Sequence, residues 1–145
     1  MMDVVDAIGL LRRGETAQGR ARLLELWDEY SRAGARMQMC GIAHFLADTE
    51  AEARDEQEWD LRALEAATGS REAKDHDPIA PEFASFLPSL HGSAGNGYRK
   101  LGDLERARRH VRIGIARSGV LPDDAYGQQV KGVLRRLEVA LGLAD

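Results

Sequence analysis

Two histidines and one aspartate are the side chains in this sequence best suited to acid–base or metal chemistry. His44 and Asp48 lie four residues apart in a segment of helical periodicity, so their side chains share one helix face. Such a pair could serve as a general base, or as half of a metal site completed by His91. No H-E-x-x-H sequence and no pair of cysteines accompanies them. We therefore expect a structural role, in which these polar groups satisfy one another.

The other reactive residue types lack the surroundings that catalysis requires. Cys40 is the single cysteine, which excludes an internal disulfide, and its apolar setting predicts an inert packing residue. Gly95-x-Gly97 follows no strand and lacks a third glycine, so it is not a dinucleotide fingerprint. The acidic stretch 48–60 lacks the glycine and the ligand order of a calcium loop. We predict a protein that is not an enzyme and that uses no metal and no cofactor.

Composition narrows the class of protein further. The 145 residues are 43% hydrophobic and 30% charged, which is typical of one globular domain. The net charge of −4 argues against general nucleic-acid binding, and no apolar stretch approaches the roughly 20 residues of a membrane span. We expect no secretory signal and a cytoplasmic location. Charge is uneven, with 9 basic and 15 acidic side chains in residues 1–72, against 11 and 9 in residues 73–145.

The elements that would position these residues are helices. Apolar residues return every three or four positions along most of the chain, and no strand-like alternation of useful length is present. We predict one all-α domain over residues 1–145. Its expected parts are helix hairpins at about 2–33, 35–68 and 80–119, a loop at about 69–79, and a C-terminal capping helix at about 123–142. Pro88 is expected to kink its helix or to mark where the helix begins.

An internal repeat supports this division. The clearest unit, residues 87–119, contains His91-x-x-Ala94-Gly95-x-x-Tyr98, then Leu101-Gly102-Asp103, then Ala107-x-x-x-Val111. Met37-x-x-Cys40-Gly41-x-x-His44, with Ala53, is a weaker copy in 35–68, and unit 2–33 agrees in spacing. Small residues at 95 and 107 would mark a close crossing of two helices, and Gly102 a tight turn. The pattern resembles the tetratricopeptide repeat (TPR) family, although Gly114 stands where alanine is usual.

The resemblance implies a right-handed superhelical stack of the three antiparallel hairpins, closed by the capping helix. In that family the first helix of each hairpin lines a concave groove that binds a protein or peptide partner. The first unit would contribute Val4, Ile8 and Leu11. The groove positions carried over from the other two units are Gln38, Ile42, Phe45, Leu46, Ser89, Gly92, Asn96, Arg99 and Lys100. The resemblance makes Asn96, Arg99 and Lys100 candidates for holding a partner's carboxylate.

An apolar groove of this kind needs a cover, because monomers rarely leave such a patch exposed. The chain's own loop, a second copy forming a homodimer, or a partner peptide could each provide it. We therefore predict a protein–protein interaction module, a TPR-like scaffold or adaptor that binds a partner or itself. The alternatives are a regulatory sensor for a small hydrophobic ligand or signalling peptide and, third, a small-molecule enzyme using His44, Asp48 and His91. Nucleic acid and membrane are not expected as partners.

Overall fold

The computed structural model describes residues 3–74 and 81–144, and all of its regular structure is helical. The prediction of an all-α chain is confirmed for these residues. The elements are α1 (Val4–Arg12), α2 (Thr16–Ala33), α3 (Arg36–Asp48), α4 (Ala53–Thr68), α5 (Pro81–Ala84), α6 (Leu87–Lys100), α7 (Leu104–Ala116), the 3-10 helix η1 (Ser118–Val120) and α8 (Ala125–Ala140). Part of the expected loop, residues 75–79, lies outside the described residues, as do Met2 and residue 80.

Helix ends follow the local chemistry of the chain. Five glycines end or follow helices with positive φ, at positions 14, 34, 69, 102 and 142, and this backbone conformation is easiest without a Cβ. Asp103 and Asp124 cap the N-termini of α7 and α8 by accepting backbone N–H bonds. Pro88 lies in the first turn of α6, where its missing N–H costs nothing, so it marks the helix start and not a kink.

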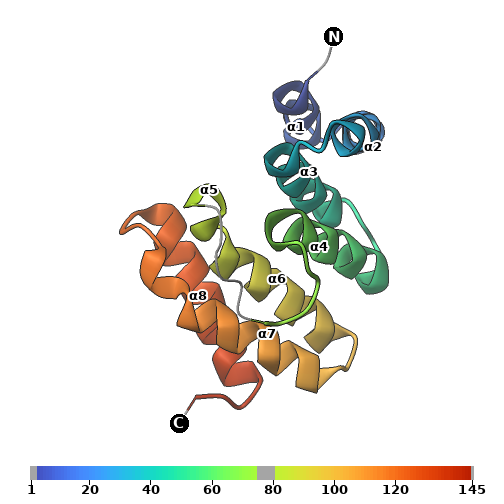
Figure 1. Ribbon diagram of the computed structural model, residues 1–145. Helices are drawn as coiled ribbons and strands as arrows, with labels where there is room; N and C mark the ends of the chain where they lie inside the picture. The colour runs from blue at the N-terminus through green and yellow to red at the C-terminus, as the bar shows by residue number, and fades with distance from the viewer. Residues whose placement is uncertain (1–2, 75–80, 145) are drawn as a thin grey trace.

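The helices pack in chain order. Neighbours α1 and α2, α3 and α4, and α6 and α7 contact one another as pairs, and α2–α3 and α4–α6 contacts join one pair to the next (Figure 1). One large apolar cluster extends from α1 to the start of α6, with Leu23, Ile42, Leu46, Leu64 and Leu87 fully buried. Two smaller clusters hold α7 and α8. Within the described residues, no helix combines the length and the hydrophobicity that a membrane crossing requires.

One leucine of the last helix packs closely against both α6 and α7. A Cβ on Gly114 of α7 would lie 2.9 Å from Leu134 Cδ2, and one on Gly92 of α6 would lie 3.3 Å from the same atom. Leu134 of α8 is buried. Glycine at position 114 therefore makes room for the Leu134 side chain of α8.

Candidate functional site

The exposed face of α3 is not the face that the sequence predicted. Ile42 and Leu46 have no exposed surface, so they belong to the core and cannot line a groove. The exposed residues of α3 include Met37, Gly41, His44 and Asp48, with Gln38 exposed beside them. The predicted stripe of Gln38, Ile42 and Phe45 lies one position after the exposed residues Met37, Gly41 and His44. One position along an α-helix corresponds to a rotation of about 100°.

On helix α6, most of the residues predicted to line the groove are at least partly exposed. Ser89 and Asn96 are partly exposed, and Arg99 and Lys100 are exposed at the end of the helix. Gly92, expected to line the groove, is buried against Leu134 of α8. On α1, Val4, Ile8 and Leu11 are partly buried, and Val4 and Leu11 pack against the core.

An apolar cleft of about 260 Å³ lies between α3, the start of α6 and the first turn of α8. We call it the α3/α6 cleft. Met37, Phe86 and Tyr126 are large apolar residues with 36%, 37% and 38% of their surface exposed, respectively. The side chains and backbone that line the cleft belong to Met37, Cys40, Gly41, His44, Phe45, Phe86, Ser89, Leu90 and Tyr126. Of the predicted groove residues, Phe45 and Ser89 are among them.

Two ionisable groups of the α3/α6 cleft, the Cys40 thiol and the Tyr126 hydroxyl, have raised pKa values. Burial raises the pKa of the Cys40 thiol to about 11, so the thiol carries its proton near neutral pH. Burial also raises the pKa of Tyr126, and a hydrogen bond with Ser89 partly offsets this rise. The Tyr126 hydroxyl donates to the Ser85 carbonyl oxygen over 3.3 Å. Neither the thiol nor the phenol therefore presents a charge near neutral pH that an apolar group would have to desolvate.

The charged end of α6 is already engaged with its own neighbours. Arg99 donates from Nε and Nη2 to Asn96 Oδ1, at 3.1 and 2.9 Å. Lys100 Nζ forms an ion pair with Glu56 of α4. A partner carboxylate would have to compete with Glu56 for Lys100, whereas Asn96 keeps its amide N–H groups and Arg99 its remaining guanidinium N–H groups as donors.

Asp60 of α4 adds an unusual carboxyl group to this end of the molecule. It is 9% exposed, and its pKa rises to about 7, first because of burial and then because of the nearby charges of Glu56 and Asp48. The nearby positive charge of Lys100 lowers the pKa of Asp60 and so partly offsets this rise. No sequence pattern indicates this buried carboxyl, since Asp60 lies in a run of acidic residues that predicts a solvated helix face.

His44, Asp48 and His91 do not form one site. His44 is exposed on α3, with its ring edge-on to Phe45 at a centroid distance of 5.5 Å. His91 is fully buried between α6 and α7, where its Nδ1 lies 3.0 Å from Nδ1 of His110. His110 is thus buried too. No group of three metal-ligating side chains occurs in the part of the chain that the structure describes.

A polar hollow of about 340 Å³ between residues 71–73 and the α6/α7 pair is the other concentration of cations. It contains Arg71, Arg106 and Arg109, the residue types that would hold an anion. Each is already neutralised by an acidic neighbour, at 2.8 to 2.9 Å. This hollow therefore attracts an anion less strongly than its three arginines would suggest.

No family model, curated protein or solved structure matches this chain. The resemblance to tetratricopeptide repeats stays a prediction made from the sequence, and the function has to be inferred from the clefts, charges and contacts of the molecule itself.

Proposed function

We propose that this chain is a protein–protein interaction module, and that its α3/α6 cleft takes up an apolar side chain of a partner polypeptide. One observation carries the proposal: Met37, Phe86 and Tyr126 leave more than a third of their surface exposed around a single apolar cleft. Large apolar groups gathered in this way are typical of interaction sites, whereas scattered ones are not.

The size of the cleft favours a side chain over a small-molecule ligand. Its volume of about 260 Å³ lies below the roughly 300 to 1,000 Å³ that small-molecule sites occupy. An aliphatic or aromatic side chain of a peptide needs less room and would bring its backbone to the rim. Tyr126 and Ser89 supply hydroxyl groups there, which can bond to that backbone.

A TPR-like stack of the hairpins is part of this proposal. Three helix pairs follow one another, and a Cβ on Gly95 would lie 2.6 Å from Val111 Cγ2 and 3.2 Å from the Ala107 carbonyl oxygen. That close crossing supports the repeat pattern at positions 95 and 107. In such a stack α3 and α6 are first helices of their hairpins, so the cleft between them belongs to the concave side.

The test fills the cleft without harming the helix. Gly41 is exposed in α3, and a Cβ placed on it meets nothing within 4 Å. Gly41→Met should therefore stabilise the helix by about 0.5–1 kcal/mol, because glycine is a poor helix former. The same side chain should occupy the cleft and block a partner. Gly132→Met in α8 is the matched control, because Gly132 is also helical, has room for a Cβ and lies outside the cleft.

A random-peptide phage library panned on the wild-type protein provides the partners. We expect enriched peptides to share one large apolar residue, to bind Gly41→Met at least about tenfold more weakly, and to bind Gly132→Met as they bind the wild type. Peptides that bind all three proteins equally, or a library that yields no enriched peptide, would contradict the proposal. A dimer in sedimentation that Gly41→Met dissociates would identify a second copy of the chain as the occupant.

A further inference from the structure

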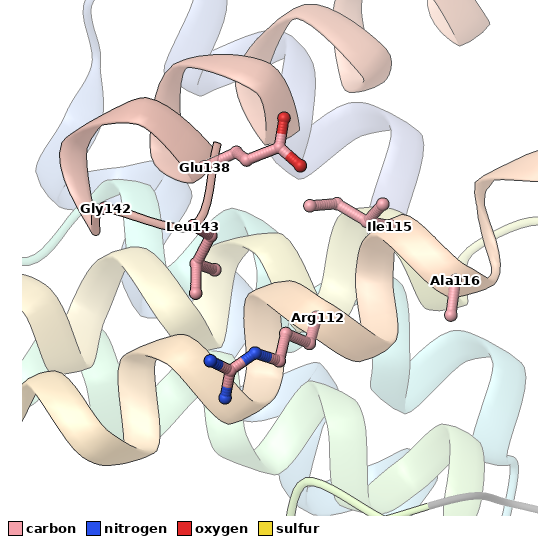
Figure 2. Close-up of a pocket in the computed structure, with 6 residues that line it drawn as sticks. All are labelled: Arg112, Ile115, Ala116, Glu138, Gly142 and Leu143. Atoms are coloured by element: carbon pink, nitrogen blue, oxygen red, sulfur yellow. The ribbon is translucent and has the colours of Figure 1, made fainter. Parts of the chain in front are cut away.

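A second surface, independent of the α3/α6 cleft, lies on the outer side of α7 and α8. Two adjoining hollows, of about 330 and 190 Å³, share Ile115 and Glu138 and together form what we call the α7/α8 groove. Figure 2 shows the larger hollow, which is lined by Arg112, Ile115 and Ala116 of α7, by Glu138 of α8, and by Gly142 and Leu143 just after α8. The smaller hollow adds Ser118, Lys131, Leu134 and Arg135.

The helix pairing of the fold leaves this groove unfilled. Helices α1, α3 and α6 are each followed by a helix that packs against them, namely α2, α4 and α7. Helix α8 packs against α6 and α7, but no helix follows it among the described residues. The groove between α7 and α8 thus lies beside the last described helix, where no further described helix covers it. Its floor is apolar, with Ile115 and Leu143 partly exposed and Leu134 beneath them.

The charges around the groove indicate what an occupant would carry. Arg112, Lys131 and Arg135 make no ion pair with any residue that the structure describes. Other cations of the described residues are paired, among them Arg62, Arg71, Lys100, Arg106 and Arg109. Among the described residues that line the two hollows, these three cations stand against the single carboxylate of Glu138, so this lining has a net positive charge. An acidic occupant would gain attraction and an increased association rate from it.

From these observations we infer that the α7/α8 groove binds an acidic amphipathic helix of a partner protein. Two apolar side chains on one face of that helix fill the two hollows, and carboxylates along its flanks meet Arg112, Lys131 and Arg135. Helix-in-groove binding uses apolar anchors three and four residues apart, which suits two hollows that share a wall. Glu138 lies at that shared wall, where it disfavours a carboxylate midway between the anchors.

A designed peptide tests the inference directly. The probe is a fluorescein-labelled amphipathic peptide of about 18 residues, or about five helical turns, with leucines on one face and glutamates on both flanks. A second peptide has lysines in place of the glutamates. Fluorescence anisotropy should show saturable binding of the acidic peptide that weakens with added salt, and no binding of the basic one. Amide shifts in NMR spectra of the labelled protein should map to α7 and α8.

Charge-reversal variants then distinguish binding in the α7/α8 groove from nonspecific attraction between the peptide and the charged protein surface. Lys131→Glu with Arg135→Glu should weaken the acidic peptide at least about tenfold, since two attractions become repulsions. Arg12→Glu with Arg32→Glu, at two exposed arginines without ion pairs on α1 and α2, changes the net charge equally and should leave binding unchanged. Glu138→Gln should strengthen binding about threefold. Circular dichroism checks that each variant keeps its helicity.

Four results would overturn the inference. These are no binding of the acidic peptide at millimolar concentration, equal binding of the basic peptide, equal weakening by the α1/α2 reversals, and amide shifts confined to α3 and α6. A wild-type dimer that only the α8 reversals dissociate would also overturn it, because the occupant would then be a second copy of this chain. None of these results depends on Gly41. If the inference about the α7/α8 groove fails, the proposal for the α3/α6 cleft is therefore still decided by the Gly41→Met experiment.

Discussion

At the scale of single residues, Asp60 is the side chain whose environment conflicts most with its chemistry. A carboxylate in water ionises near pH 4, whereas burial and the charges of Glu56 and Asp48 raise the pKa of Asp60 to about 7 in the folded chain. Between these two values the folded state holds a proton that the unfolded state has released. The free energy of unfolding therefore falls as pH rises from about 4 to about 7 and stays reduced above that range.

Asp60→Asn should remove this pH dependence. The amide is neutral throughout, so the variant should be more stable than the wild type at pH 8 by about 3 kcal/mol, the equivalent of roughly three pKa units less some relaxation. At pH 4 the two proteins should differ little. Urea unfolding at both pH values measures the difference, and Asp28→Asn at an exposed site of α2 is the control. A stability difference that is the same at pH 4 and pH 8 would refute the assignment.

At the scale of the element, the sequence predicts that a helix exists better than it predicts which way the helix faces. The periodicity and the glycines at 14, 34, 69 and 102 place the helices well, since these signals are local. Helix α3 is apolar nearly all round, so no stripe in its sequence distinguishes the core side from the exposed side. Only packing against α2 and α4 decides it, which is why Ile42 and Leu46 are core residues and Met37 and His44 line the cleft.

The same limit explains which cleft residues the sequence missed. Phe86 and Tyr126 are separated by 40 positions and meet only because α8 packs across α6. Nothing within either segment indicates the other. By contrast, Gly95 and Ala107 belong to one repeat unit, and their close approach was predicted from their small size alone.

That close approach makes an element-level prediction for Gly95→Ala. The methyl group would gain about 1 kcal/mol in helix propensity. However, it would lie 2.6 Å from Val111 Cγ2, and Val111 is fully buried, so α6 and α7 would have to separate. We expect a net loss of about 1–3 kcal/mol in the free energy of unfolding. Gly132→Ala, which has room for its methyl group, should instead be neutral or stabilising. A Gly95→Ala variant as stable as the wild type would show that the helices do not cross this closely.

At the scale of the whole molecule, the helices pack around separate apolar clusters, which are joined mainly by the contact between α4 and α6. The large apolar cluster ends at Leu90, and the clusters that hold α7 and α8 share no buried residue with it. Across the junction, Gln57 Nε2 donates to the Ala94 carbonyl oxygen over 2.9 Å, and Gln57 is 3% exposed. Arrays whose units contact only their neighbours unfold cooperatively only while each junction is strong.

Gly97 makes that junction testable by a double-mutant cycle. A Cβ on Gly97 would overlap the carboxamide of Gln57, so Gly97→Ala must expel Gln57 and break its bond to Ala94. We expect Gly97→Ala and Gln57→Ala each to destabilise the chain, and the double variant to lose about 1 kcal/mol less than the sum, because the methyl group then fills the vacated space. Urea unfolding measures all four proteins. In the single variant Gly97→Ala the transition should also broaden, as the α1–α4 and α6–α8 parts begin to unfold separately. Strict additivity with an unchanged slope would mean that Gln57 and Gly97 do not meet, and that the two parts are joined elsewhere.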